Sequence, residues 1–336
     1  MASRGEIPFA SIQRYRVAKM KRYTVLLTRG LLLVWGVTSS SCGGTVPLAG
    51  TVDVTRSERV WVDASRSTPR AGAFPGAPTR TLRTLIWQPA SAAALPLLVL
   101  AHGLGVLPED FEAFARTVAA AGFILAAPAF PLTNHDVPGG QVLFNDLNNQ
   151  PGDLSFVITQ ILQAASTEGD PLLGRIILPD VAVLGQSLGA ATVIGLTRKN
   201  CCRDVRIHAS ILSAAPLLAG SFGPDPISAA GPPTLILHGT ADTTVPYVTA
   251  TQLYSLIDPP RFLVGLKGAE HADALESQVE PPIPARDAGQ RATVAFLNAV
   301  FRGGVAELDA ALAALAAQGN DVHADPGDRE IPRSVD

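Results

Sequence analysis

Short, mostly apolar runs recur along the chain from residue 96 onward. They cover residues 97–101, 123–127, 181–184, 207–212, 234–237 and 262–264. Runs that are apolar at nearly every position, rather than at every second position, are typical of strands covered on both faces, as in a parallel sheet. We therefore expect these segments to be the strands of one largely parallel sheet.

Longer stretches with helical spacing separate these runs. They cover residues 111–119, 154–165, 190–198, 247–257, 287–302 and 306–317. Earlier in the chain, 60–63 and 81–87 alternate between apolar and polar residues, which predicts antiparallel strands at one edge of the sheet. The alternation of strands and helices indicates βαβ units. The predicted fold class is therefore α/β, a mostly parallel, doubly wound sheet flanked by helices.

The boundaries of this domain are predicted from breaks in the pattern. We expect a linker at 42–57, where Gly and Pro interrupt the sequence, and the α/β domain at 58–319. The segment between residues 212 and 234 is rich in Gly, Pro and Ala and is too short for a large helical lid domain. The polar end, 320–336, is typical of a flexible C-terminal tail.

The composition narrows the possible classes of protein. A chain of 336 residues that is 47% hydrophobic and 16% charged can bury one large core. The formal net charge of −3 combines a basic segment, 1–41, of net charge +6 with a remainder of −9. An acidic body without a basic stripe argues against nucleic acid as a partner.

The basic segment has the layout of a secretory signal. Lys21 and Arg22 precede the apolar run 31–37, and the small residues 38–41 follow it. The apolar run is well short of the roughly 20 residues that span a bilayer. We therefore expect residues 1–41 to direct export, and Met20 would be the more ordinary start of such a signal.

Cys42 directly follows the small residues and raises the question of a lipid anchor. The segment resembles a bacterial lipoprotein signal, whose cysteine is lipidated after cleavage, although Ser39 stands where that pattern prefers leucine. Lipidation of Cys42 would attach the protein to a membrane at the cell surface. Simple cleavage would release it, and an uncleaved anchor is a third reading.

The remaining cysteines, Cys201 and Cys202, are adjacent. Metal sites usually have two or more residues between cysteine ligands, and no His pair lies nearby at ligand spacing. The sequence leaves open a vicinal disulfide or two free thiols, and it predicts no metal site.

The run at 181–184 leads into the strongest chemical signal of the chain. Gly185-Gln186-Ser187-Leu188-Gly189 follows it directly, and 190–196 reads as a helix. Gly-x-Ser-x-Gly alone is weak evidence, because a chain of this length shows it by chance about one time in ten. A strand, a sharp turn, a serine and a helix in this order predict a nucleophile elbow with Ser187 as the nucleophile.

A serine nucleophile needs a base and an acid that orients the base. Asp242 follows the strand 234–237, and His271 follows the strand 262–264, so both are expected at the edge of the sheet where such sites lie. Asp225 or Asp258 are alternatives for the acid. His102 and His238 each form a His-Gly pair at a strand end, where we expect structural bonds to backbone.

Four motifs now occur in a consistent order. They are His102-Gly103-Leu104-Gly105, Gly185-Gln186-Ser187-Leu188-Gly189, the stretch 238–246 with Asp242, and Gly268-Ala269-Glu270-His271. Over about 80–300 the chain resembles the α/β-hydrolase family, in particular its bacterial dienelactone-hydrolase-like, platelet-activating-factor-acetylhydrolase-like and cutinase-like (polyester hydrolase-like) esterases. The order serine, aspartate, histidine is the order of that fold.

The resemblance implies a mechanism. Ser187 would attack an ester carbonyl and form an acyl-enzyme, with His271 as base and Asp242 as its orienting acid. The backbone N–H groups of Leu104 and Leu188 would form the oxyanion hole. Such chemistry needs no metal and no organic cofactor.

The substrate is less well defined by the sequence. Candidate substrate contacts are Gly103, Gly105, Val106, Gln186, Val245 and Tyr247. An open cleft with apolar surroundings favours a carboxylesterase acting on small-molecule, lipid or polymer esters. A lipase, a polyester hydrolase and a phospholipase-type acetylhydrolase are alternatives. An alternative of another class is a non-catalytic cell-surface binding protein on a hydrolase fold.

Overall fold

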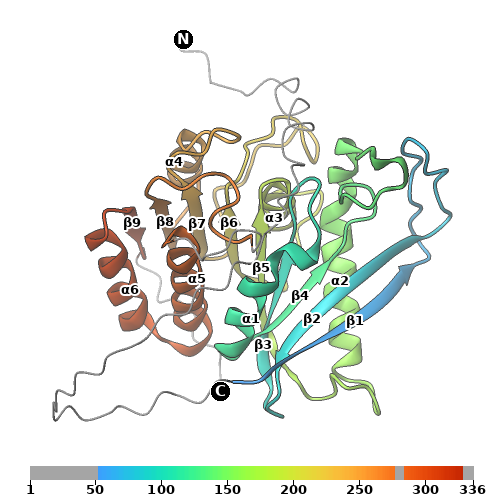
Figure 1. Ribbon diagram of the computed structural model, residues 1–336, viewed down its shortest axis with the longest axis horizontal. Helices are drawn as coiled ribbons and strands as arrows, with labels where there is room; N and C mark the ends of the chain where they lie inside the picture. The colour runs from blue at the N-terminus through green and yellow to red at the C-terminus, as the bar shows by residue number, and fades with distance from the viewer. Residues whose placement is uncertain (1–51, 277–283, 328–336) are drawn as a thin grey trace, which may run out of the picture. The chain divides into compact units, whose positions relative to one another are not determined.

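The structure is a computed structural model that describes residues 52–276 and 284–327 (Figure 1). The predicted export signal at 1–41 with its alternative start at Met20, Cys42 and most of the predicted linker lie outside the described residues. Among the helices that are described, none is both long enough and apolar enough to cross a bilayer.

In the described part of the chain, nine strands form one sheet in the order β1-β2-β4-β3-β5-β6-β7-β8-β9. The strands are β1 (Val54–Asp63), β2 (Arg80–Pro89), β3 (Leu95–Ala101), β4 (Ile124–Pro128), β5 (Ile176–Gln186), β6 (Ile207–Ser213), β7 (Thr234–Gly239), β8 (Arg261–Leu266) and β9 (Asp321–Asp325). All neighbours from β4 to β8 are parallel, whereas β1, β2 and β9 are antiparallel to their neighbours. The predicted mostly parallel sheet with antiparallel strands at one edge is confirmed.

Helices cover both faces of this sheet (Figure 1). One core packs against α1 (Glu112–Ala120), α5 (Pro284–Arg302) and α6 (Val305–Ala317); the other packs against α2 (Gln150–Ala164), α3 (Leu188–Arg198) and α4 (Val248–Leu256). Successive residues of β5 divide between the two cores: Ala182 and Leu184 lie in the first, Val181 and Val183 in the second. Because side chains of a strand alternate between faces, burial on both faces requires the continuous apolar run.

Three short 3-10 helices, which the hydrophobic pattern did not predict, follow β3 and β4. They are η2 (Pro108–Phe111), η3 (Pro138–Gly140) and η4 (Phe144–Asn149). Residues 214–233, between β6 and β7, contain no helix or strand, in agreement with the predicted lack of a large lid domain there. Side chains from η4 and from this β6–β7 segment meet beside the site described below.

Both ends of the predicted domain need correction. β1 begins at Val54, inside the predicted linker 42–57, and pairs along its length with β2. The first part of the predicted flexible tail 320–336 is the ordered edge strand β9, which pairs with β8. The strand is held by an ion pair between Arg261 and Asp325, whose closest N···O distance is 3.0 Å. Val322 and Ala324 alternate with three polar residues in β9, but a pattern of only five residues at the polar end of the chain did not distinguish this strand from a tail.

Candidate active site

Ser187 lies on a sharp turn between β5 and α3, with backbone φ of 54° and ψ of −119°. A non-glycine residue with positive φ is strained, at a cost of about 1–3 kcal/mol. The turn also needs its two glycines. A Cβ on Gly185 would collide with the backbone carbonyl of Gly189, and a Cβ on Gly189 would collide with that of Ala101. The Gly-x-Ser-x-Gly pattern is therefore a steric requirement of this turn.

The structure brings Ser187, His271 and Asp242 together. His271 Nε2 lies 2.8 Å from Ser187 Oγ, and His271 Nδ1 lies 2.7 Å from Asp242 Oδ2. The three residues follow β5, β8 and β7, whose carboxyl ends meet at one edge of the sheet. The Asp242 carboxylate is buried, whereas 20% of the His271 side chain is exposed. This arrangement can pass a proton from the serine hydroxyl to the imidazole.

The environment of Asp242 keeps its carboxylate ionised. Burial raises its pKa, but hydrogen bonds from His238, His271 and the backbone amide of Val245 outweigh burial and hold the pKa well below its usual range. Asp242 Oδ1 accepts hydrogen bonds of 2.8 Å from the amides of Thr244 and Val245. An ionised carboxylate can only accept at Oδ2, so Nδ1 of His271 carries the proton and Nε2 faces the serine hydroxyl as an acceptor.

The loop that carries His271 is fastened to the end of β7. The amide of Ala241 donates to the carbonyl of Ala269 at 3.0 Å, and the amide of Gly268 donates to Thr240 Oγ1 at 2.9 Å. A Cβ on Gly239 would collide with the carbonyl of Ala269. These contacts place the loop after β8 directly against the loop that carries Asp242.

His102 and His238 bond to backbone, as the sequence indicated. His102 Nε2 accepts from the amide of Phe130 at 2.9 Å, and its Nδ1 donates to the carbonyl of Gly103 at 2.7 Å. Burial lowers the pKa of His102 to about 4, so this side chain is neutral. His238 Nε2 donates to the carbonyl of Val245 at 2.8 Å and lies 3.3 Å from Asp242 Oδ2. Both rings brace the loops around the site.

Leu188 and Leu104, the two predicted oxyanion-hole residues, both lie beside Ser187. Leu188 is the first residue of α3, where a backbone amide has no partner within the helix and faces the positive end of the helix dipole. Leu104 follows Gly103, where a Cβ would come within 3.2 Å of Ser187 Cβ. The side chains of Leu104 and Leu188 belong to the same apolar cluster.

The predicted substrate contacts divide into two groups. Gly105 has a φ of +74° and a Cβ there would meet no atom within 4 Å, while a Cβ on Gly103 would meet Gln186 and Val106. These four residues therefore lie on or beside the loop next to the serine. Among the described residues, the buried Oε1 of Gln186 has no hydrogen-bond partner.

Val245 and Tyr247 take part in contacts that hold the fold together, and their role as substrate contacts stays a prediction. Both polar backbone groups of Val245 are occupied, the amide by Asp242 and the carbonyl by His238. The Tyr247 hydroxyl donates to Asp321 Oδ2 of β9 at 2.8 Å. Burial and the adjacent carboxylate of Asp321 raise the pKa of Tyr247. The first residue positions the acid, and the second fastens the edge strand.

Sequence reasoning missed most of an apolar cluster next to the serine turn. Besides Leu104 and Leu188, it contains Ala191, Phe144, Leu147, Leu218, Phe222 and Cys202. Phe222 is buried although its φ is 60°, an unusual conformation for a bulky residue. Phe144 and Leu147 come from η4, and Leu218 and Phe222 come from the segment between β6 and β7. These two segments show no periodicity. The positive φ of Phe222 has no signature in the sequence.

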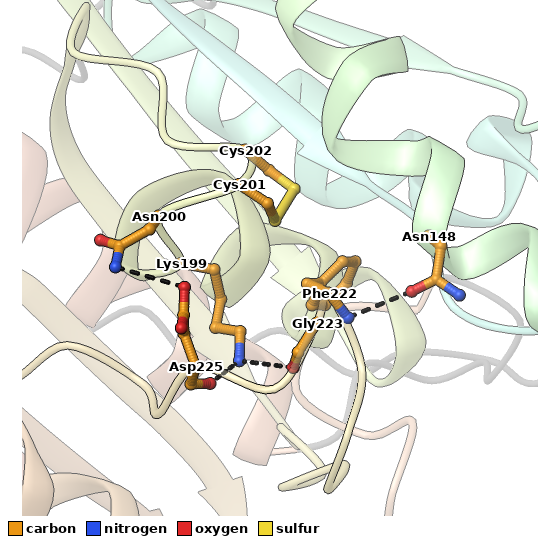
Figure 2. The surroundings of a disulfide bond; sticks show 8 residues. All are labelled: Asn148, Lys199, Asn200, Cys201, Cys202, Phe222, Gly223 and Asp225. Carbon is orange, nitrogen blue, oxygen red and sulfur yellow. Dashed lines mark hydrogen bonds between the residues drawn. A yellow bond between two sulfur atoms is a disulfide. The ribbon is translucent and has the colours of Figure 1, made fainter.

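Cys201 and Cys202 form a vicinal disulfide, which decides between the two alternatives left open by the sequence. Figure 2 shows how the neighbouring residues hold the segment between β6 and β7. Lys199 Nζ donates to the carbonyls of Gly223 and Asp225. The amide of Phe222 donates to Asn148 Oδ1 of η4 at 3.1 Å. The turn that follows α3 therefore helps to keep Phe222 in the apolar cluster.

Within residues 52–276 and 284–327, no group of three or more His, Cys, Asp or Glu side chains is arranged to hold a metal ion.

Comparison with known proteins defines the fold. No protein-family model matches the chain, and no curated protein matches it in sequence. Among solved structures, the chain is similar to a ferulic acid esterase from Streptomyces cinnamoneus, with a TM-score of 0.57 and 17% sequence identity. The match covers 75% of this chain and 91% of that chain. The expected α/β-hydrolase fold is confirmed, and a similarity at this level of identity shows the fold alone.

Proposed function

We propose that this protein is an exported serine hydrolase that cleaves carboxylic esters through an acyl-enzyme. The observation that carries the proposal is the continuous hydrogen-bonded chain from Ser187 through His271 to Asp242, starting at a strained turn. Asp225, one alternative for the acid, accepts a hydrogen bond from Asn200 beside the disulfide instead. A non-catalytic binding protein would have no need of this arrangement of Ser187, His271 and Asp242.

The residues divide the reaction as follows. Ser187 Oγ attacks the ester carbonyl carbon while Nε2 of His271 takes the hydroxyl proton, and Asp242 stabilises the imidazolium. The amides of Leu104 and Leu188 stabilise the negative charge on the carbonyl oxygen. His271 returns the proton to the leaving alcohol. A water molecule then attacks the acyl-enzyme with His271 again as base, which releases the carboxylic acid and restores Ser187.

An ester of an apolar, uncharged acyl group is the substrate that we propose. The apolar side chains around Leu104 and Leu188 favour the binding of an uncharged acyl group. The structurally similar protein is a ferulic acid esterase, which supports ester cleavage on this fold. Small-molecule, lipid and polymer esters all fit this description, so lipase, polyester hydrolase and acetylhydrolase activities belong in the test. Attachment through a lipidated Cys42 remains part of the proposal for the exported protein.

The test is an activity panel of uncharged esters of increasing acyl length, run with a fluorophosphonate probe of reactive serines. We expect turnover and labelling of the wild-type protein, and loss of both, by about 10³-fold or more in turnover, in Ser187→Ala. Ser255→Ala, at an exposed serine of α4, is the matched control and should retain both. A wild-type protein that neither reacts with the probe nor cleaves any ester would support the binding-protein alternative.

A further inference from the structure

A chain of buried polar side chains connects the serine turn with the loop that carries Leu104. Its centre is Gln150, the first residue of α2. Gln150 Nε2 donates to Thr133 Oγ1 at 2.7 Å, and Gln150 Oε1 accepts a hydrogen bond from the Thr192 hydroxyl. Gln150, Thr133 and Thr192 are all fully buried. A primary amide has a donor end and an acceptor end, so one side chain can bridge two elements.

Each end of this chain lies next to one of the two proposed oxyanion donors. Thr192 is one helical turn after Leu188 on α3, and its Oγ1 lies 3.2 Å from the carbonyl oxygen of Leu188. At the other end, the carbonyl of Thr133 accepts a 2.7 Å hydrogen bond from the amide of Gly105. That amide belongs to the peptide unit immediately after Leu104. The bridge therefore joins α3, α2 and the loop 103–105.

We propose that Gln150 is a positioning residue that holds the amides of Leu104 and Leu188 in register for the oxyanion. This inference rests on the proposed function. Leu188 is placed by the helix that it begins. The loop 103–105 has two glycines, and a Cβ on Gly105 would meet no atom within 4 Å, so side-chain packing does not restrain the Gly105 end of the loop. The hydrogen bond from Gly105 to Thr133, and through Gln150 to α3, supplies that restraint.

Thr197 shows what a purely structural hydroxyl looks like on the same helix. It is buried like Thr192, and its Oγ1 donates to the carbonyl of Val193 at 2.7 Å, four residues earlier. This bond stays within α3. The Thr192 hydroxyl also lies near the carbonyl four residues earlier, that of Leu188, but in addition it donates to Gln150 of α2, which distinguishes the two otherwise similar positions.

The expected effect follows from the geometry of the transition state. Loss of one oxyanion donor typically lowers turnover by about 10²–10³-fold. A donor that is displaced rather than removed should cost less. We therefore expect Gln150→Leu, which keeps the volume but breaks both hydrogen bonds, to lower kcat by about 10–100-fold. KM should change by less than about threefold, because the donors act on the charge that develops in the transition state.

The experiment compares Gln150→Leu, Thr192→Val and Thr197→Val with the wild type in kcat, KM, melting temperature and inhibition by a trifluoromethyl ketone. This inhibitor forms a hemiketal with an active serine and places its oxyanion where the reaction does. Weakened inhibition by the same factor as kcat, in Gln150→Leu and less strongly in Thr192→Val, supports the proposal. Thr197→Val should leave kcat and inhibition unchanged. If Gln150→Leu does not fold, the nearly isosteric Thr192→Val decides.

Two outcomes overturn the inference. The first is a lowered melting temperature in Gln150→Leu and Thr192→Val with unchanged kcat and inhibition, which would make the bridge purely structural. The second is an equal loss of kcat in Thr197→Val, which would mean that any buried hydroxyl of α3 matters alike. A wild-type protein without esterase activity or probe labelling would instead refute the proposed function itself, and the inference with it.

Discussion

Two clusters of polar side chains lie at the same edge of the sheet, and they differ in how far they are buried. One is Ser187, His271 and Asp242. The other centres on Arg80, the first residue of β2, which lies at the carboxyl edge of the parallel strands because β2 runs antiparallel to β4. Each cluster contains a hydrogen bond between distant parts of the sequence: Ser187 and His271 are 84 positions apart, and Arg80 and Asp153 are 73 positions apart.

The Arg80 cluster is closed. Arg80, Asp146 and Asp153 are fully buried, and the guanidinium binds Asp153 with distances of 2.5 and 2.6 Å and Asp146 with distances of 2.7 and 3.1 Å. Burial disfavours the charge of Arg80, but the hydrogen bonds to Asp153 and Asp146 outweigh burial and raise its pKa. Fixed opposite charges saturate every nitrogen of the guanidinium, so the cluster ties β2 to η4 and α2 and offers no group for a reaction.

The Ser187 cluster is open. Its imidazole is partly exposed, its serine is strained, and its one carboxylate faces a ring that can gain a proton. The comparison shows that burial and short hydrogen bonds do not by themselves mark an active site. Strain at a nucleophile and an unsaturated proton acceptor are the distinguishing features.

The largest effect is expected for Asp242→Asn. The amide presents an N–H group to His271 Nδ1, which favours the tautomer with the proton on Nε2 and removes the acceptor for Ser187. We expect kcat to fall by about 10⁴-fold, or about 5 kcal/mol in activation free energy. Steady-state kinetics measure kcat, and chemical unfolding measures the stability of the variant. Asp146→Asn is the matched control in the closed cluster, and a similar loss of kcat there would erase the contrast.

Asp153→Ala should lower the stability of the protein and leave kcat largely unchanged. It leaves Arg80 buried with one carboxylate fewer, and breaking a buried ion pair in this way costs about 3–5 kcal/mol of unfolding free energy. The kcat of the molecules that remain folded should change by less than about tenfold. Urea unfolding followed by fluorescence tests the first statement. A stability close to that of the wild type would show that the closed cluster is not a tie between its elements.

His102 lies next to the active site, but both of its ring nitrogens are already hydrogen-bonded to backbone groups. It therefore tests whether a residue beside the site can behave like the closed Arg80 cluster. Burial lowers its pKa from 6.5 to about 4, so the neutral form is favoured in the folded protein. Its contribution to stability is present above pH 6.5 and is lost as the pH falls toward 4, on the order of 3 kcal/mol in all. Between pH 7.5 and pH 4.5, the unfolding free energy should fall further in the wild type than in His102→Gln. Equal pH dependence in the two proteins would contradict this assignment.

Tyr247→Phe should have the smallest effect. It removes the hydrogen bond to Asp321 at a half-buried site, which is worth about 1 kcal/mol of stability. Since the hydroxyl is engaged with β9, kcat and KM should stay within about twofold of the wild type. A clear rise of KM would return Tyr247 to the substrate contacts that the sequence indicated.

The parts of the fold that could be predicted have local signals in the sequence. Runs buried on both faces revealed the parallel strands, and the turn at Ser187 revealed itself because both of its glycines are sterically required. The positions of Asp242 and His271 followed from the rule that loops at the carboxyl ends of parallel strands meet. η4 and the conformation of Phe222 lack such signals, and the alternation in β9 is only five residues long. The contacts of all three are with distant segments.

The sequence by itself determined the order of strands and helices, the strained turn and the chemical identities of the three groups that meet at it. Only the tertiary structure decided that Cys201 and Cys202 are joined, that Tyr247 binds the edge strand, and that Gln150 joins Thr133 to Thr192. The physical reason is the distance along the chain over which each interaction acts. Backbone geometry and apolar periodicity act over a few residues and leave their mark in the local sequence. A hydrogen bond such as that from Gln150 to Thr133 exists only after separate elements have packed around it.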